Sequence, residues 1–235
     1  MANCIIASTS SLYGQKPLAY FESTIRELYK HCEEVLFIPY ARPGGRTYEA
    51  YYTLLQPIFK NLEIRLRSIH QFDSALKAIK NAEGYYTGGG NTFMLVHQLY
   101  EHQLIPALKQ EIIKGKPYLG TSAGSNICGL TMQTTNDMPI VYPKSFKTLG
   151  ILPFNINPHY LDPNPDRTHN GETRETRIIE YHAFNTPPVI GLREGSWIEV
   201  KDENISLKGD LTARIFEQFK KPYEILPDTD LTYLK

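Results

Sequence analysis

The chain has 235 residues, and its 25 Lys+Arg are balanced by 25 Asp+Glu, so the formal net charge at pH 7 is zero. A chain without excess positive charge lacks the electrostatic surface of a nucleic-acid or anionic-membrane binder, and we expect neither partner. Hydrophobic residues make up 41% of the sequence, which is enough for a sizeable core and excludes a disordered protein. These values predict one domain over residues 1–235.

The three cysteines, Cys4, Cys32 and Cys128, are widely spaced in the chain. They form no CxxC pair or zinc pattern, and an odd number is unsuited to a disulfide framework. The N-terminus has no basic region followed by a long apolar run, and no run approaches the roughly 18 residues that span a bilayer. We therefore expect buried, reduced thiols and a cytoplasmic protein.

The first half of the chain alternates short apolar stretches with stretches of helical periodicity. Strands are predicted at residues 3–7, 34–40, 62–69, 84–87 and 117–119, and helices at residues 18–31, 48–62, 73–82, 92–100 and 104–114. This alternation predicts an α/β fold, with a mostly parallel sheet and helices on both faces, as in flavodoxin-like proteins. The strands of such a sheet end at one edge, where ligands bind.

The pattern changes after residue 128, and the end of the chain is predicted to form a C-terminal β-ribbon. The other predicted elements are extended segments at residues 131–142 and 154–160, a polar loop at residues 162–171 and a helix at residues 172–183. Residues 189–192 and 196–200 are predicted to form a strand pair around the turn Arg193-Glu194-Gly195. No internal repeat or linker marks a second domain.

The segment Gly120-Thr121-Ser122-Ala123-Gly124 matches the G-x-S-x-G pattern between a short apolar strand and a possible helix start. A sharp strand-to-helix turn strains the central residue and holds its side chain above the sheet edge. The turn also aims the backbone N–H of Ala123 at the group that Ser122 would attack. Ser122 is therefore a candidate nucleophile, with a purely structural turn as the alternative.

A serine nucleophile needs a base within hydrogen-bond reach and a third group that orients this base. Among seven histidines, His159 is the best candidate, because an extended segment ends there in a turn fixed by Pro158. A structural histidine is the alternative. The third group is either Asp137, which follows Ser122 closely in the chain, or Glu194, which follows an apolar strand and can project toward the same edge.

The glycine-rich turn Gly88-Gly89-Gly90-Asn91 follows a predicted strand and has two interpretations. It could cradle a phosphate, but it lacks the full G-x-G-x-x-G spacing and the Lys-Ser/Thr of a P-loop. It could instead supply a second N–H group to an oxyanion hole beside Ala123, because glycine lets the backbone approach a substrate oxygen closely.

Six segments in order along the chain resemble the peptidase E family of α-aspartyl dipeptidases. The segments are GGGNTF at residues 88–93, GTSAG at 120–124, TTNDMPIV at 134–141, INPH at 156–159, GETR at 171–174 and GLREGSW at 191–197. The strand-to-helix turn at residues 120–124, here called the elbow, is a weakly specific signal by itself. The ordered set of six segments is strongly specific and covers nearly the whole chain. Thr121 departs from the family, which often has an aromatic residue there. This serine peptidase family is related in fold to class I glutamine amidotransferases and to cyanophycinase.

The resemblance implies a serine-type dipeptidase that hydrolyses short peptides after an N-terminal aspartate. It implies Ser122 as the nucleophile, His159 as the base and Glu194 as its orienter. The N–H groups of Gly90 and Ala123 would form the oxyanion hole. No metal and no cofactor are implied. The partner would be a small peptide with an N-terminal Asp, and a homodimer is a further possibility.

An aspartyl substrate requires a cation for its side-chain carboxylate and an acceptor for its free amino group. Arginine binds a carboxylate with two parallel hydrogen bonds, and Arg174 is the first choice, ahead of Arg42 and Arg193. Asp137 and Asn136 are candidate acceptors for the amino group. Two other functions stay open, namely cyanophycinase-like cleavage of β-aspartyl peptides and a non-catalytic flavodoxin-like binding domain.

Overall fold

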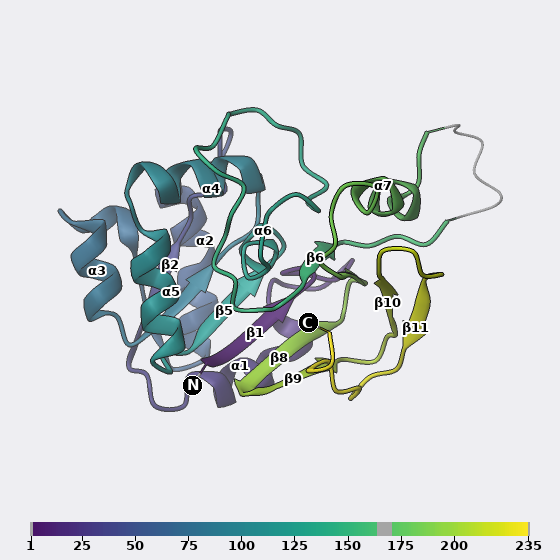
Figure 1. Cartoon of the computed structure of the whole chain (residues 1–235). Helices are drawn as coiled ribbons and strands as arrows, with labels where there is room; N and C mark the ends of the chain where they lie inside the picture. Colours follow the sequence, from purple (N-terminus) through teal and green to yellow (C-terminus); the bar gives the residue numbers. More distant parts are fainter. Residues whose placement is uncertain (1, 164–170, 235) are drawn as a thin grey trace.

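A computed structural model describes residues 2–163 and 171–234 of the chain (Figure 1). The strands of the main sheet are β1 (Ala2–Ala7), β2 (Glu34–Ile38), β3 (Arg65–Ser68), β4 (Gly84–Thr87), β5 (Tyr118–Thr121), β8 (Trp197–Asp202) and β9 (Asn204–Lys208). Within this described part they form a seven-stranded sheet in the order β3-β2-β4-β5-β1-β8-β9. The strands from β3 to β1 in this order are parallel, whereas β8 is antiparallel to β1 and β9 is antiparallel to β8.

Helices cover both faces of this sheet, as the sequence predicted. They are α1 (Glu22–Leu28), α2 (Tyr48–Asn61), α3 (Ala75–Asn81), α4 (Thr92–Glu101), α5 (Ile105–Ile113) and the short α6 (Ala123–Asn126), with 3-10 turns at Ala19–Phe21 and Ile69–Gln71. Alternate residues of β1 point to opposite faces: Ile5 packs in the apolar cluster with α1 and α2, and Ile6 packs in the cluster with α3, α4 and α5. The predicted mostly parallel α/β fold is confirmed, and its parallel strands end at one edge.

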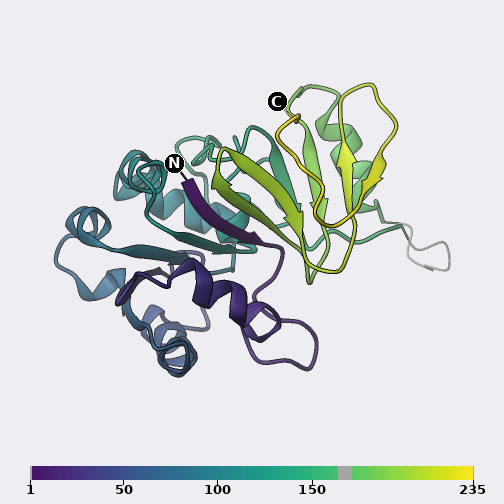
Figure 2. The same ribbon diagram turned by 90° about the horizontal axis from the view of Figure 1, so that it is seen from below.

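The end of the chain adds a second sheet. It consists of β6 (Asn155–Pro158), β7 (Val189–Leu192), β10 (Ala213–Phe216) and β11 (Tyr223–Ile225), in the order β11-β10-β7-β6, together with helix α7 (Arg174–Tyr181). Strands β6 and β7 are parallel, and the last pair in their register is Pro158 with Leu192. Figures 1 and 2 show this second sheet beside the β8–β9 edge of the main sheet.

The predicted pairing of residues 189–192 with residues 196–200 is wrong. These segments are β7 and β8, which lie in different sheets, because β7 pairs with β6 and β10 while β8 pairs with β1 and β9. The intervening turn contains Gly195 at φ +98°, a backbone conformation that favours glycine. The predicted C-terminal β-ribbon is present as the β10–β11 hairpin of the second sheet, and a further hairpin, β8–β9, belongs to the main sheet.

Residues 131–142, predicted as an extended segment, do not pair into a strand. This segment has only an isolated bridge between Thr131 and Lys147. Its polar side chains bind nearby backbone groups, as when Thr135 Oγ1 accepts from the Asp137 N–H at 3.2 Å, and such local bonds compete with a strand ladder. Most of the predicted polar loop at residues 162–171 lies outside the described residues.

The cysteines are free thiols, and Cys4 and Cys128 are buried as expected. Burial raises the pKa of the Cys4 thiol to about 12, so this group stays protonated. Cys32 is only partly buried, so the prediction of three buried thiols is wrong for this residue. In the part of the chain that the structure describes, we find no helix with the length and apolar character needed to cross a bilayer.

Candidate active site

Ser122 occupies the turn between β5 and α6 that the sequence motif predicted. Its backbone angles are φ 54° and ψ −111°, which are strained for a residue with a Cβ. Hydrogen bonds hold this strained turn: the Ser122 N–H donates to the Ala7 carbonyl at 3.2 Å, and its carbonyl accepts from Ser125 and Asn126 at 2.9 Å each. The Ser125 hydroxyl also donates to Ala7 at 2.6 Å. The carbonyl at the end of β1 thus holds the elbow in place.

The glycine that closes the elbow is required by its close contact with the neighbouring strand. A Cβ on Gly124 would collide with the carbonyl of Thr87, the last residue of β4. The small residue lets α6 start directly against β4 and keeps Ser122 at the edge of the sheet.

The Ser122 hydroxyl, the His159 ring and the Glu194 carboxylate lie in line. Ser122 Oγ is 2.9 Å from His159 Nε2, and His159 Nδ1 is 2.6 Å from Glu194 Oε1. Because a carboxylate can only accept, Nδ1 carries the proton toward Glu194, and Nε2 is then an acceptor for the Ser122 hydroxyl. His159 follows β6 and Glu194 follows β7, so the two parallel strands deliver both side chains to one edge.

The glycine turn after β4 passes beside Ser122. A Cβ built on Gly89 would fall 3.0 Å from Ser122 Cβ, and Gly90 has φ +148° and lies against the carbonyl of Ala41. The next N–H, that of Asn91, donates to the same carbonyl at 2.7 Å. The turn therefore brings backbone close to the serine, as the oxyanion-hole interpretation requires, although Gly89 contacts Ser122 more directly than the predicted Gly90.

Asp137 lies at the start of α4 and not on His159. Its Oδ2 accepts from the Thr92 N–H at 2.7 Å, from Thr92 Oγ1 at 2.6 Å and from Thr135 Oγ1 at 3.0 Å. Asn136 is held by its neighbours as well, since its Nδ2 donates to the Pro158 carbonyl and its Oδ1 accepts from Asn157. Asp137 thus caps the helix that follows the glycine turn, and Asn136 ties this loop to β6.

Arg174 is the first residue of α7, which begins at the cap Thr173. Together with neighbouring residues it lines a cavity of about 270 Å³, and the other lining residues are Leu161, Asp162, Glu172, Thr173 and Arg177. Since Leu161 is two residues beyond His159, the cavity borders the segment that follows His159. Arg174 was the first choice for the substrate carboxylate, and the structure places it at this cavity.

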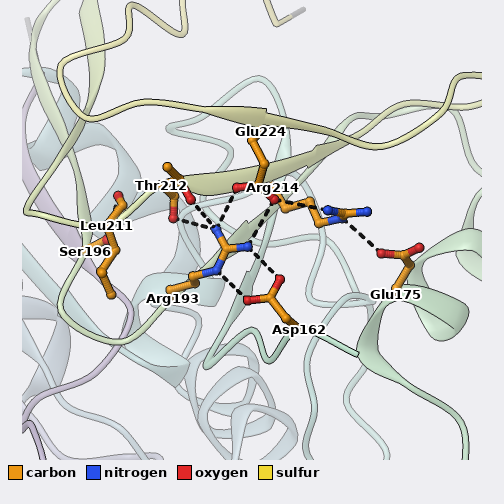
Figure 3. A network of polar contacts seen from close by, with 8 residues as sticks. All are labelled: Asp162, Glu175, Arg193, Ser196, Leu211, Thr212, Arg214 and Glu224. Atoms are coloured by element: carbon orange, nitrogen blue, oxygen red, sulfur yellow. Dashed lines mark hydrogen bonds and ion pairs between the residues drawn. The ribbon is translucent and has the colours of Figure 1, made fainter. Parts of the chain in front are cut away.

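Arg193 is engaged by neighbouring groups, as Figure 3 shows. Its guanidinium binds Asp162 through Nε and Nη2 at 2.9 and 2.6 Å, and Glu224 through Nη1 and Nη2 at 2.9 and 3.0 Å. The hydrogen bonds that Arg193 donates to Asp162 and Glu224 raise the pKa of its guanidinium. Glu224 also binds Arg214, which in turn pairs with Glu175 of α7. The Arg193 guanidinium is therefore already paired with two carboxylates of the protein and is a poor candidate for binding a substrate carboxylate.

Two residues make contacts near the site that the sequence did not indicate. The Ser8 hydroxyl contacts the His159 backbone, and Tyr20 donates to the Thr9 carbonyl at 2.8 Å. Burial is the larger cause that raises the pKa of Tyr20, and the negative charge of Glu194 raises it further. No local pattern in the sequence links Ser8 to His159, which lies 151 positions away.

A strained serine in line with a histidine and a carboxylate, on an α/β sheet, is the arrangement of a serine hydrolase. The chain belongs to peptidase family S51, whose family model matches residues 4–208. It is therefore a serine peptidase, and the predicted membership of the peptidase E family is confirmed. Within residues 2–163 and 171–234, no group of three or more His, Cys, Asp or Glu could hold a metal ion.

Relatives match nearly the whole chain. A Drosophila melanogaster protein described as a probable alpha-aspartyl dipeptidase is 37% identical, over 99% of this chain and 97% of the relative. Peptidase E of Streptomyces coelicolor is 40% identical, over 99% and 94% of the two chains. The crystal structure of a peptidase from an acI-B1 actinobacterium has a TM-score of 0.72 at 16% identity, covering 99% of this chain and 97% of its own, and supports the fold.

Proposed function

We propose that the protein is a dipeptidase that hydrolyses Asp-X dipeptides through a Ser122–His159–Glu194 triad and an acyl-enzyme intermediate. The observation that carries this proposal is the contact of His159 with Ser122 at 2.9 Å and with Glu194 at 2.6 Å, on a strained strand-to-helix elbow. The relative described as an alpha-aspartyl dipeptidase supports the aspartyl preference.

The mechanism follows from these contacts. His159 Nε2 takes the hydroxyl proton while Ser122 Oγ attacks the scissile carbonyl, and Glu194 stabilises the imidazolium that forms. The N–H groups of Ala123 and Gly90 donate hydrogen bonds to the carbonyl oxygen as it becomes negatively charged. The peptide C–N bond then breaks as the imidazolium protonates the leaving amine, and the acyl group stays on Ser122 as an ester. In the second stage His159 takes a proton from a water molecule that attacks this ester. The ester C–O bond breaks as the imidazolium returns the proton to Ser122 Oγ, and aspartate is released.

Substrate recognition is assigned to the loops on either side of the triad. Arg174 would pair with the aspartyl carboxylate of the substrate, since it lines the cavity that begins two residues after His159. Asp137 would accept from the substrate amino group through Oδ1, because Oδ2 is engaged with Thr92 and Thr135. Asn136 would hold this loop in place. A cytoplasmic location and a homodimer remain predictions, to be checked by cell fractionation and by light scattering.

The proposed reaction is tested with dipeptides that differ only at the first residue. We expect Asp-Leu to be cleaved far faster than Asn-Leu, Glu-Leu and the β-aspartyl isomer. Ser122→Ala should lower Asp-Leu turnover by about 10³–10⁶-fold, the range found when a triad nucleophile is removed, and leave the melting temperature unchanged. Retention of more than about a tenth of the turnover would remove Ser122 from the mechanism. Preferential cleavage of the β-aspartyl isomer would indicate a cyanophycinase-like enzyme instead.

The role of Arg174 is tested with Arg174→Met, which keeps much of the side-chain volume but deletes the charge. Loss of one partner of a buried charge pair costs about 2–5 kcal/mol, so kcat/KM for Asp-Leu should fall correspondingly. Arg174→Lys should recover only part of this loss, because an ammonium cannot form both parallel hydrogen bonds. Arg177→Met, in the same cavity and helix, is the matched control.

A small uncharged phosphonate separates specificity from catalysis in these variants. It should label Ser122 in Arg174→Met at nearly the wild-type rate, because the triad is intact. An equal drop in labelling and in Asp-Leu hydrolysis would mean that Arg174 supports the fold or the triad, and not the substrate carboxylate.

A further inference from the structure

Ser8 is the first residue after β1 and is completely buried. β1 lies between β5 and β8 in the main sheet. The Ser8 N–H donates to the Ser196 carbonyl at 3.1 Å, in the turn that carries Glu194. A serine hydroxyl in this position is removed from water, so its own hydrogen bonds must be made within the protein.

The Ser8 hydroxyl joins the ends of β6 and β7. It donates to the Leu192 carbonyl at 2.7 Å and accepts from the His159 N–H at 2.9 Å. The direction of both bonds is fixed, because a carbonyl can only accept and a backbone N–H can only donate. One hydroxyl therefore connects the residue that supplies the base to the strand that leads, two residues later, to Glu194.

The His159 backbone has left the strand ladder at this point. The register of β6 with β7 ends at Pro158 and Leu192, and His159 has φ +55°, which is unusual for a residue with a side chain. The Tyr160 N–H returns to the Leu192 carbonyl at 3.1 Å, so the His159 N–H is turned away from β7. Ser8 supplies the acceptor for this N–H and thereby stabilises the bend that aims the imidazole.

The same end of β1 also holds the nucleophile. The Ala7 carbonyl accepts from the Ser122 N–H and from the Ser125 hydroxyl. Consecutive residues, Ala7 and Ser8, thus contact the elbow on one side and the His159 and Glu194 strand ends on the other. The relative position of the three side chains depends on this short segment.

We propose that Ser8 is a positioning residue that sets the His159 ring between Ser122 and Glu194, an inference that rests on the triad of the proposed function. Ser8 does not touch the reacting atoms. It acts through the His159 backbone and the end of β7. Its loss should therefore disturb the chemical step and leave substrate binding largely unchanged, because the residues assigned to substrate recognition lie on other loops.

Ser8→Ala is the direct test, because it removes only the hydroxyl. A misplacement of about 1 Å at a catalytic group can cost about 10²-fold, so we expect kcat for Asp-Leu to fall by about 10–100-fold with KM changed less than about twofold. Thr148→Val is the matched control. It also deletes a buried hydroxyl that donates to a backbone carbonyl, Gly129 at 2.7 Å, and it should keep wild-type kcat.

A double-mutant cycle shows whether Ser8 acts through the contact between His159 and Glu194. In a Glu194→Gln background, Ser8→Ala should lower kcat much less than in the wild type, because the His159 orientation that Ser8 supports is already lost. Additive losses, a raised KM with unchanged kcat, or wild-type kcat in folded Ser8→Ala would each overturn the proposal. If Ser8→Ala does not fold, Ser8→Cys, which keeps a weaker donor, is measured in the same way and should show an intermediate loss of kcat.

Phosphonate labelling of Ser122 keeps this test independent of the substrate assignment. If wild-type protein is labelled but does not cleave Asp-Leu, the aspartyl substrate is wrong, and the labelling rates of Ser8→Ala and Thr148→Val still decide the role of Ser8. A Ser8→Ala labelling rate equal to that of wild type would contradict the inference.

Discussion

The His159 ring is fixed from both of its nitrogens and from its own backbone. Glu194 accepts at Nδ1, Ser122 lies at Nε2, and the backbone N–H is bound by the Ser8 hydroxyl. The first of these contacts sets the tautomer, and the tautomer decides whether Nε2 can take a proton from the serine. The side chains of His159 and Glu194 are partly exposed, which leaves the site open to a short peptide.

Glu194→Gln and Asp137→Asn separate the two carboxylates that the sequence left open. An amide at residue 194 can present its N–H₂ to His159 Nδ1 and select the wrong tautomer, so kcat should fall by about 10²–10⁴-fold. Asp137→Asn should instead raise KM for Asp-Leu and change kcat little, because Asp137 is assigned to the substrate amino group and does not contact His159. Steady-state kinetics of both variants, with thermal melts as the control for folding, check this prediction. A large kcat loss confined to Asp137→Asn would reverse the assignment.

The parallel strand ends explain why part of the site could be predicted from sequence. Apolar runs followed by turns located β1, β2, β4 and β5, and the G-x-S-x-G pattern placed Ser122 directly after β5. A parallel sheet brings such turns to one edge, so the serine and the glycine turn could be expected together. These inferences need only local patterns and the rule that a crossover connects parallel strands.

The partition of the last strands into two sheets could not be predicted in the same way. Residues 189–192 and 196–200 are apolar and separated by a turn, which is also the pattern of a hairpin. Which strand each one joins depends on pairings with β1 and β6, far away in the chain. The same limit applies to Ser8, whose hydroxyl bonds span 151 and 184 positions. The short spacing between Ser122 and Asp137 counted against Asp137, and the family resemblance then selected Glu194.

At the scale of the whole molecule, a series of ion pairs connects the second sheet to the segments around the site. It runs from Asp162 through Arg193, Glu224 and Arg214 to Glu175 (Figure 3). It joins the segment after His159, the residue before Glu194, the β10–β11 hairpin and the first turn of α7. The two ends of the network are thus attached to the segment that follows His159 and to the helix that carries Arg174.

Glu224 makes this network sensitive to acid. Burial alone would raise the pKa of this carboxyl, but hydrogen bonds from Arg193, Thr212 and Arg214 outweigh it and lower the pKa to about 2. A carboxyl whose pKa is lower in the folded state stabilises the protein above its unfolded pKa of about 4.3, and this contribution is lost as the pH falls toward 2. The network should therefore weaken between about pH 4.5 and pH 2 and be fully present at neutral pH.

Thermal melts of Glu224→Gln across this range test the prediction. At pH 7 the variant should melt below the wild type, because Arg193 and Arg214 lose a charged partner, and the difference should shrink steadily as the pH approaches 2. Glu203→Gln, on the exposed turn between β8 and β9, controls for the loss of one negative charge and should follow the wild-type curve. If the melting temperature of Glu224→Gln also followed that of the wild type from pH 7 to pH 2, the acid sensitivity would lie in other carboxyls. The stability of the second sheet would then have to come from its apolar contacts.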